Sequence, residues 1–295
     1  MTTIINVPHS LEDKSFEQVL DQVAPLPLDE KIIVDTRHAR WASPYGLTAL
    51  LALAQTRVER PILYVPESDN VSSYWSRMDF FKHAAELYEI QGKVKASRAT
   101  ESSVLLEVTS ISKSDDIHTV VDKIQQRAQD ALVKSLHLDA KITMRFSMAL
   151  SEVCQNIVEH AGRGGWAAVQ TYTWRVRLGG RKVVVIAVCD AGVGFRQSLE
   201  SATGFQRKDR WDDGQALEET VMRGASRFRD PGRGQGLAGV KKFVGTWDGK
   251  LSIRSGTARI AVLPKGDWDE DDPLAEDLAP FPGAQVQITI PERVQ

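Results

Sequence analysis

The stretch SEVCQNIVEH, residues 151–160, decides how the rest of the chain is interpreted. It places Glu152, Asn156 and His160 four positions apart, so on an α-helix they lie on one face, one turn above the next. A carboxylate, a carboxamide and an imidazole in a row suit a hard cation and a reactive water. His160 could instead face the negative end of the helix dipole. We therefore expect a helix over about 139–160 with a polar row beside its apolar face.

Downstream of this helix, a predicted buried strand ends in a carboxylate. Residues 183–189 (VVVIAVC) are continuously apolar and run directly into Asp190-Ala-Gly192-Val-Gly194. A carboxylate at the end of a buried strand is costly unless it is paired. It could accept a hydrogen bond from the exocyclic amino group of adenine, and the glycines would let backbone approach a flat base. The same spacing also occurs in a plain turn after a strand.

A second glycine motif, Gly232-x-Gly234-x-Gly236-Leu237, precedes another predicted helix. Successive glycine amides can surround phosphate oxygens, and the following helix adds the positive end of its dipole. The motif overlaps a dinucleotide-binding pattern, but the loop before it (223–233) is basic and is not a buried strand. A Walker loop is excluded because no Gly-Lys-Ser/Thr follows.

In this order, the three pieces resemble the GHKL ATPases, the group of DNA gyrase, histidine kinases and mismatch-repair ATPases, over roughly residues 103–292. The resemblance implies a Bergerat fold: an α/β sandwich of a mixed sheet with helices on one face, and a mobile nucleotide lid at about 195–231. It also implies ATP and Mg²⁺ as cofactors, with Asn156 holding the metal, Asp190 reading adenine and Glu152 acting as general base or its counterpart. The remaining residues implied to bind the nucleotide are Gly192, Gly194, Gly232, Gly234, Gly236 and Leu237.

The first third of the chain alternates predicted strands and helices. The expected elements are buried strands at 31–35 and 61–66 and helices at 47–55 and 70–86. A polar, weakly patterned stretch at 92–102 marks the expected boundary. The sequence thus predicts a small α/β domain at 1–98, followed by the ATP-binding domain at 103–295.

This N-terminal part resembles a STAS domain, the anti-sigma-factor-antagonist module. The likeness is a strand ending in Val34-Asp35, then a loop that closes with Gly46 before an apolar helix. In that family the loop holds a phosphorylatable serine two positions before the glycine. Pro44 occupies that position here and cannot take phosphate, whereas Ser43 suits a helix N-cap. The resemblance therefore implies a degenerate STAS-like docking module rather than a phosphoswitch.

An acidic run lies near the C-terminus. Residues 267–277 carry seven acidic side chains. Such a run is typical of a solvated loop or a disordered insert, and a docking site for a basic partner is the alternative.

Composition points to an ordinary globular protein. The chain has 295 residues, a net charge of about −2, 42% hydrophobic and 26% charged residues. This balance argues against nucleic acid or an anionic membrane as partner. Cys154 and Cys189 lie in apolar-rich elements and are interpreted as buried thiols, which favours a reducing cytoplasm.

Several functions remain open at this point. The combination of a STAS-like unit and an ATP-binding domain in one chain favours an ATP-dependent regulator of the anti-sigma or serine-kinase type, acting on a partner protein. An ATP-hydrolysing conformational switch and a non-catalytic ATP-sensing module are the alternatives, and a homodimer is an open arrangement. A histidine kinase is disfavoured because the best candidate phosphoacceptor, His118, is followed by Thr119. The chain is accordingly an ATPase or a protein serine kinase if it is an enzyme.

Overall fold

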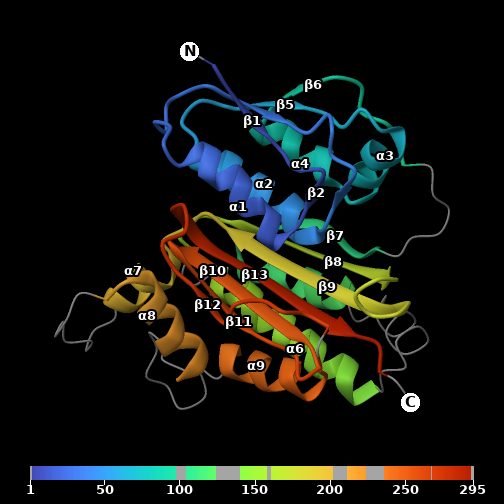
Figure 1. The fold of residues 1–295 in the computed structure, drawn as a ribbon, viewed down its shortest axis with the longest axis vertical. Coiled ribbons are helices and arrows are strands. Elements are labelled where there is room, and N and C mark those ends of the chain that lie inside the picture. The colour runs from blue at the N-terminus through green and yellow to red at the C-terminus, as the bar shows by residue number, and fades with distance from the viewer. Residues whose placement is uncertain are drawn as a thin grey trace.

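The computed structural model describes residues 2–97, 104–123, 140–157, 161–201, 211–223, 236–266 and 268–293. Its elements stack in layers, and Figure 1 shows their order. A small sheet lies at one end, and helices α1 (Asp13–Val23) and α2 (Pro44–Thr56) separate it from a large sheet. Helices α6 (Ala140–Asn156) and α9 (Gly236–Thr246) cover the far face of the large sheet.

The small sheet belongs to the N-terminal unit, residues 2–97. Its strands, in spatial order, are β1 (Thr3–Asn6), β3 (Ile32–Asp35), β5 (Ile62–Tyr64) and β6 (Glu89–Gln91), and all their pairings are parallel. Two short strands, β2 (Ser10–Leu11) and β4 (Trp41–Ala42), pair separately. The helices of this unit not yet given are α3 (Asp69–Arg77) and α4 (Phe80–Leu87). The predicted strands at 31–35 and 61–66 are therefore present.

The helix expected over 70–86 is instead two helices. Asp79, between α3 and α4, has a φ of +56°, in the left-handed region. This conformation ends one helix and redirects the chain into the next, because it is not compatible with a continuous right-handed helix. The expectation of a single helix was therefore wrong, although its apolar stripe is buried.

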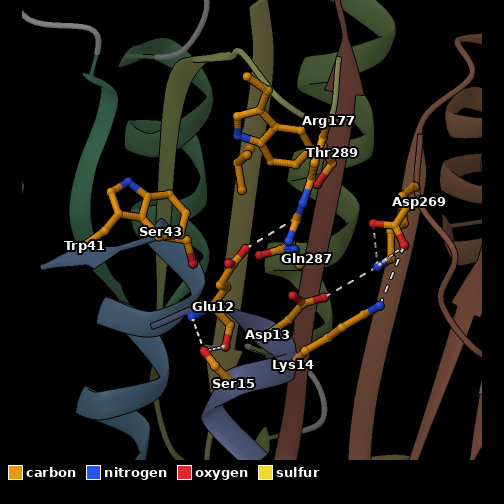
Figure 2. A pocket seen from close by; sticks show the side chains of 13 residues that line it. Glu12, Asp13, Lys14, Ser15, Trp41, Ser43, Arg177, Asp269, Gln287 and Thr289 are labelled. Atoms are coloured by element: carbon orange, nitrogen blue, oxygen red, sulfur yellow. Dashed lines mark hydrogen bonds and ion pairs between the residues drawn. The ribbon is translucent and has the colours of Figure 1, made fainter. Parts of the chain in front are cut away.

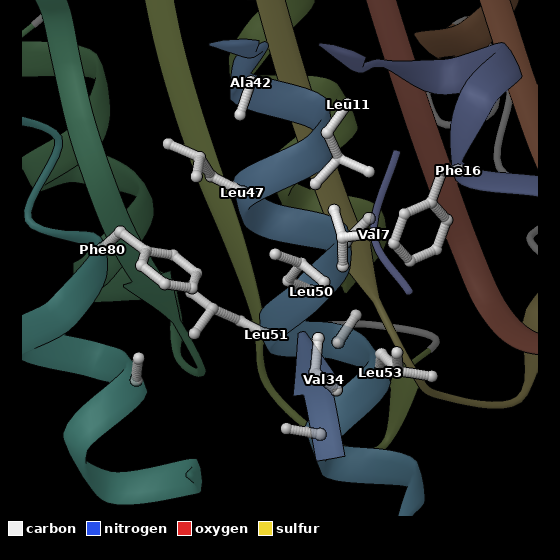
Figure 3. Packing of buried hydrophobic residues seen from close by; sticks show 14 of the residues in the cluster. Val7, Leu11, Phe16, Val34, Ala42, Leu47, Leu50, Leu51, Leu53 and Phe80 are labelled. Carbon is white, nitrogen blue, oxygen red and sulfur yellow. The ribbon is translucent and has the colours of Figure 1, made fainter. Parts of the chain in front are cut away.

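Helix α2 begins as the sequence predicts. The Ser43 side chain accepts a hydrogen bond from the Gly46 amide at 3.2 Å, and Pro44 occupies the first turn. Every residue from 44 to 54 is buried. A helix that is apolar on all sides must be covered on all sides, and α2 lies between the two sheets. Figure 3 shows its leucines pointing toward both.

The large sheet belongs to the C-terminal unit, residues 104–293. Its spatial order is β12-β11-β10-β13-β9-β8-β7. The strands are β7 (Val104–Ile111), β8 (Gly165–Trp174), β9 (Arg181–Asp190), β10 (Lys250–Gly256), β11 (Ala258–Val262), β12 (Leu274–Ala275) and β13 (Phe281–Pro291). The predicted α/β class is confirmed.

The strand directions in the large sheet differ from the expectation. All pairings among its described strands are antiparallel, whereas we expected a mixed sheet. Tight turns account for two of these pairings, since such a turn can join only antiparallel neighbours. Gly179 and Gly180 make such a turn between β8 and β9, both with positive φ, and Gly256 (φ +63°) makes another between β10 and β11.

The smaller helical elements lie at one end of the large sheet. These are α7 (Gly194–Glu200), α8 (Asp213–Leu217) and the π-helical turn η2 (Glu218–Met222). Helix α8 begins with a capping box, which Asp212 and Gln215 form. Residues 114–123 are also helical, and the rest of the helix predicted after Asp115 lies outside the described residues.

The two units share a continuous apolar core. Helix α2 packs on β8, β9 and β13, on the face of the large sheet opposite to α6 and α9. The sheet residues that join the cluster around α2 are Val104, Val108, Trp166, Ala168, Ala187, Cys189 and Phe281, together with Ala191 just after β9. The opposite face forms a second cluster with Val153 and Ile157 of α6 and Leu237 of α9. Strand β9 is therefore buried on both faces, as its continuous apolar sequence predicts.

The acidic run is folded against the protein in its described part, 268–277. Lys250 at the start of β10 has its Nζ 3.1 Å from Asp269 and 2.8 Å from Asp271. Arg259 of β11 and Lys14 of α1 also contact Asp271, at 3.0 and 3.2 Å, and Figure 2 shows Lys14 reaching toward this loop. The solvated or disordered interpretation is wrong for Asp269 and Asp271, which the buried Lys250 neutralises, whereas Glu270, Asp272, Glu276 and Asp277 are exposed as predicted.

Among the residues that the structure describes, none of the helices combines the length and apolar character needed to cross a membrane.

Candidate functional site

Asp190 lies at the carboxyl end of β9 and is 4% exposed. Its Oδ1 accepts a hydrogen bond from the Gly192 amide at 2.8 Å. Burial raises the pKa of Asp190 to about 6, although backbone hydrogen bonds from Gly192 and Ala284 act in the opposite direction. A carboxylate this deeply buried and held by backbone amides is unusual in a residue that serves packing alone.

Glycines hold the loop after Asp190 against its surroundings. A Cβ on Gly192 would lie 2.1 Å from the carbonyl oxygen of Ala161, just beyond α6. Gly194 has a φ of +74°, and a Cβ there would lie 2.7 Å from Ser255 Oγ. Both positions therefore exclude a side chain. The structure accounts for these glycines through close packing, and their approach to a nucleotide stays a prediction.

The end of α6 lies beside Asp190. Gly165 of β8 pairs with Asp190, and a Cβ on Gly165 would lie 2.9 Å from Ile157 Cδ1 and 3.0 Å from Asp190 Cβ. Ile157 follows Asn156 directly, so the structure brings the C-terminal end of the polar helix to the end of β9. Glu152, one turn before Asn156, is partly buried, as Asn156 itself is.

The second glycine motif is described only at its end. Gly236 begins α9, and Leu237 is buried in the cluster that contains Val153 and Ile157 of α6. Helices α6 and α9 pack against each other, so the start of α9 lies on the same face of the large sheet as the polar row. Gly232, Gly234 and His160 lie outside the described residues, as do 202–210 and 224–231 of the expected lid.

Sequence reasoning missed the residues that support Asp190 from β13. Gly283 has a φ of +83°, and a Cβ there would lie 2.5 Å from Asp190 Oδ1. Gln285 is fully buried, and its Nε2 donates to the backbone oxygen of Asp190 at 2.9 Å. The available signal is the isolated glycine in the pair Pro282-Gly283, because a glycine in a strand often marks a close backbone approach.

These elements match a known family. Residues 116–246 match the family model of the histidine kinase-like ATPase domain, and the matched range contains Asn156, Asp190 and the start of α9. The match supports a GHKL-like ATPase domain in this part of the chain and, with it, the nucleotide-binding regulatory ATPase class. No curated protein matches the sequence.

The donor set suits a nucleotide with a hard cation. Asp190 offers a buried acceptor, and the carboxamide of Asn156 offers an oxygen of the kind Mg²⁺ accepts, since this ion uses few protein ligands and keeps water and phosphate for the rest. In the described part of the chain, no group of three or more His, Cys, Asp and Glu side chains is placed to hold a metal. A metal bound here would neutralise phosphate charge.

Proposed function

We propose that this protein binds ATP with Mg²⁺ on the α6 and α9 side of the large sheet and uses it to regulate a partner protein. Asp190 accepts a hydrogen bond from the adenine amino group, and Asn156 holds the metal. The observation that carries the proposal is the position of Asp190, buried and beside the end of α6 within the matched range. The glycines of both motifs line the nucleotide: Gly192, Gly194, Gly232, Gly234, Gly236 and Leu237.

Glu152 is the proposed general base. It lies one turn before Asn156 on α6, so both side chains project from the same face. A carboxylate in this position can orient or deprotonate the group that attacks the γ-phosphate, either water or a hydroxyl of a partner protein. The chain is then an ATPase in the first case and a protein serine kinase in the second.

The N-terminal unit is proposed as a STAS-like docking module that does not accept phosphate itself. Ser43 is 2% exposed and caps α2, and α2 packs on the sheet face opposite to α6 and α9. This placement favours a phosphoacceptor on a separate protein, as expected of an anti-sigma or serine-kinase type of regulator.

An ATP-driven conformational switch is the second candidate. Specific contacts favour it: the start of α7 and the start of α8 are both held by the turn between β10 and β11. Nucleotide binding that moves these segments would also change that turn.

The experiment that tests binding is thermal unfolding with and without ATP and Mg²⁺. The wild type should melt at higher temperature with the nucleotide, and Asp190→Asn should remove the shift. Asp21→Asn, at an exposed carboxylate of α1, serves as the control and should keep it. An unchanged melting temperature of the wild type would overturn the nucleotide assignment. Incubation with labelled ATP and candidate partners then separates a kinase, which labels a partner, from an ATPase.

A further inference from the structure

An interior arginine joins the two units. Arg254 of β10 is 1% exposed, and its guanidinium forms a two-bonded ion pair with Glu17 of α1, at 2.8 Å from Nε and 3.1 Å from Nη2. The guanidinium also lies over the ring of Phe281, 5.7 Å from its centroid. A bidentate pair at a buried position is geometrically specific, so it fixes the position of α1 relative to the end of β10.

The same arginine also holds the turn that follows it, residues 255–257. Its Nη1 donates to the backbone oxygen of Gly256 at 3.0 Å, and its Nη2 donates to that of Ala279. Gly256 has a φ of +63° and leaves no room for a side chain, because a Cβ would lie 2.1 Å from Asp213 Oδ2. The conformation of the turn therefore depends on Arg254.

Turn 255–257 also forms hydrogen bonds with α7 and α8, the described segments of the expected lid. The Phe195 amide, at the start of α7, donates to Ser255 Oγ at 3.1 Å. At the start of α8, Asp213 Oδ2 accepts from the Thr257 amide at 2.8 Å and from Thr257 Oγ1 at 3.0 Å. Ser255 Oγ donates onward to the backbone oxygen of Gly283, the residue packed against Asp190.

We propose that Glu17 and Arg254 are positioning residues through which docking of the N-terminal unit sets the affinity of the nucleotide site. The contacts form one continuous series from α1 through Arg254 and turn 255–257 to α7, α8 and Gly283. The part of this inference that concerns nucleotide affinity rests on the proposed function. The part that concerns α7 and α8 does not.

The physical reason lies in the burial of Arg254. Loss of the Glu17 charge leaves an interior cation without its partner, and the guanidinium must then move toward water or another acceptor. Either movement withdraws its bond to the Gly256 oxygen and loosens the turn. The hydrogen bonds of Phe195 and Asp213 to the turn then weaken together, because one turn supplies the partners of both.

The test compares Glu17→Gln with Arg177→Gln in the full chain. Arg177 pairs with Glu12 at 3.5 Å (Figure 2), so it also joins the two units by an ion pair, but it lies in the turn between β8 and β9, at the opposite end of β9 from Asp190. The first measurement is hydrogen exchange without nucleotide. Glu17→Gln should speed exchange in 194–201 and 211–223 relative to β5, and Arg177→Gln should not.

The second measurement is ATP affinity in the presence of Mg²⁺. Glu17→Gln should weaken it at least about fivefold, within the usual range of coupling between sites, and Arg177→Gln should leave it unchanged. If Glu17→Gln does not fold, Arg254→Lys replaces it, since lysine keeps the charge but cannot bond Glu17 and the turn together.

The outcomes separate the two proposals. Equal exchange and equal affinity in Glu17→Gln and Arg177→Gln, with ATP bound by the wild type, would overturn the coupling and leave the nucleotide assignment standing. Faster exchange in α7 and α8 of Glu17→Gln, with no ATP binding by the wild type, would support the structural link and overturn the nucleotide assignment.

Discussion

The hydroxyl oxygen of Thr48 lies 3.2 Å from the Sγ of Cys189, across the contact between α2 and the large sheet. Cys189 directly precedes Asp190, so the two units meet one residue away from the proposed adenine acceptor. Burial raises the pKa of the Cys189 thiol, as it does that of the Cys154 thiol on the opposite face of the sheet. The two thiols therefore report separately on the two faces.

Thiol modification should follow the opening of the two faces independently. Thr48→Ala removes the hydroxyl partner and leaves a small gap, which weakens the contact by about 1 kcal/mol or slightly more. Modification of Cys189 by an aromatic disulfide reagent should become roughly fivefold faster or more. Cys154 should react at the wild-type rate, and equal acceleration of both thiols would show global unfolding instead.

The free energy of unfolding of the ligand-free protein should fall as the pH rises from about 4 to about 6, because of Asp190. Its pKa is raised from 3.8 to about 6, so over this interval the folded state keeps a proton that the unfolded state releases. The contribution is complete below about pH 4 and lost above about pH 6, and amounts to about 3 kcal/mol at about 1.4 kcal/mol per pKa unit.

Urea unfolding over this pH range checks the contribution. Asp190→Asn should lack this decline, whereas Asp21→Asn should retain it. If the free energy of unfolding of Asp190→Asn and of the wild type changed with pH in parallel, the decline would not come from Asp190.

Glu152→Ala should retain ATP binding and lose turnover. Removal of a general base costs about 100-fold or more in rate, but the adenine and metal contacts proposed for Asp190 and Asn156 remain. Phosphate release and the ATP-induced melting shift, measured on the same sample, separate the two effects. Gln155→Ala, also on α6, is the control, and this variant should hydrolyse ATP at the wild-type rate. Wild-type turnover in Glu152→Ala would remove this residue as the base.

Ser43 should act as a helix cap and not as a phosphoacceptor. Ser43→Ala removes the bond to the Gly46 amide and should lower the free energy of unfolding by about 1 kcal/mol. Ser68→Ala is a matched control, because Ser68 precedes α3 without a side-chain capping bond, and its effect should be near zero. Labelled ATP should give the same incorporation with and without Ser43, and loss of label in Ser43→Ala would contradict this role.

Lys250 should be essential for stability. Burial alone would lower its pKa, but the carboxylates of Asp13, Asp271 and Asp269 raise it, so the lysine stays charged. Lys250→Met leaves these carboxylates buried around an apolar side chain and should cost roughly 3–5 kcal/mol. Denaturant unfolding measures the loss. Lys182→Met, at an exposed position of β9, should change little, and a similarly small effect of Lys250→Met would mean that the acidic run is held by other contacts.

Local chemistry in the sequence predicted much of the fold. Ser43 and Pro44 start α2, because this effect involves residues within a few positions. The break at Asp79 was missed, since nothing nearby forces a left-handed residue there. Tight turns make the β8–β9 and β10–β11 pairs antiparallel, and the family resemblance did not predict that the other pairs are antiparallel too.

The site could be predicted only in part. Asp190, Asn156 and the start of α9 fall on one face of the large sheet, as their motifs indicate. Long-range partners left no local pattern: Glu17 and Arg254 are 237 positions apart, and the acidic run looked solvated because its cations lie on other strands. Glu17 and Arg254 become partners only when the two units pack together, and Asp269 and Asp271 meet Lys250 only when their loop folds back onto β10.

Burial of the large sheet on both faces predicts how the chain behaves when its N-terminal unit is removed. A gene trimmed to begin at residue 104 would yield a chain that presents Trp166, Ala168, Ala187 and Phe281 to water as one apolar surface. Such a fragment is expected to self-associate or to require a chaperone. The N-terminal unit therefore also serves as the cover of this sheet face, and a fragment without it needs another cover.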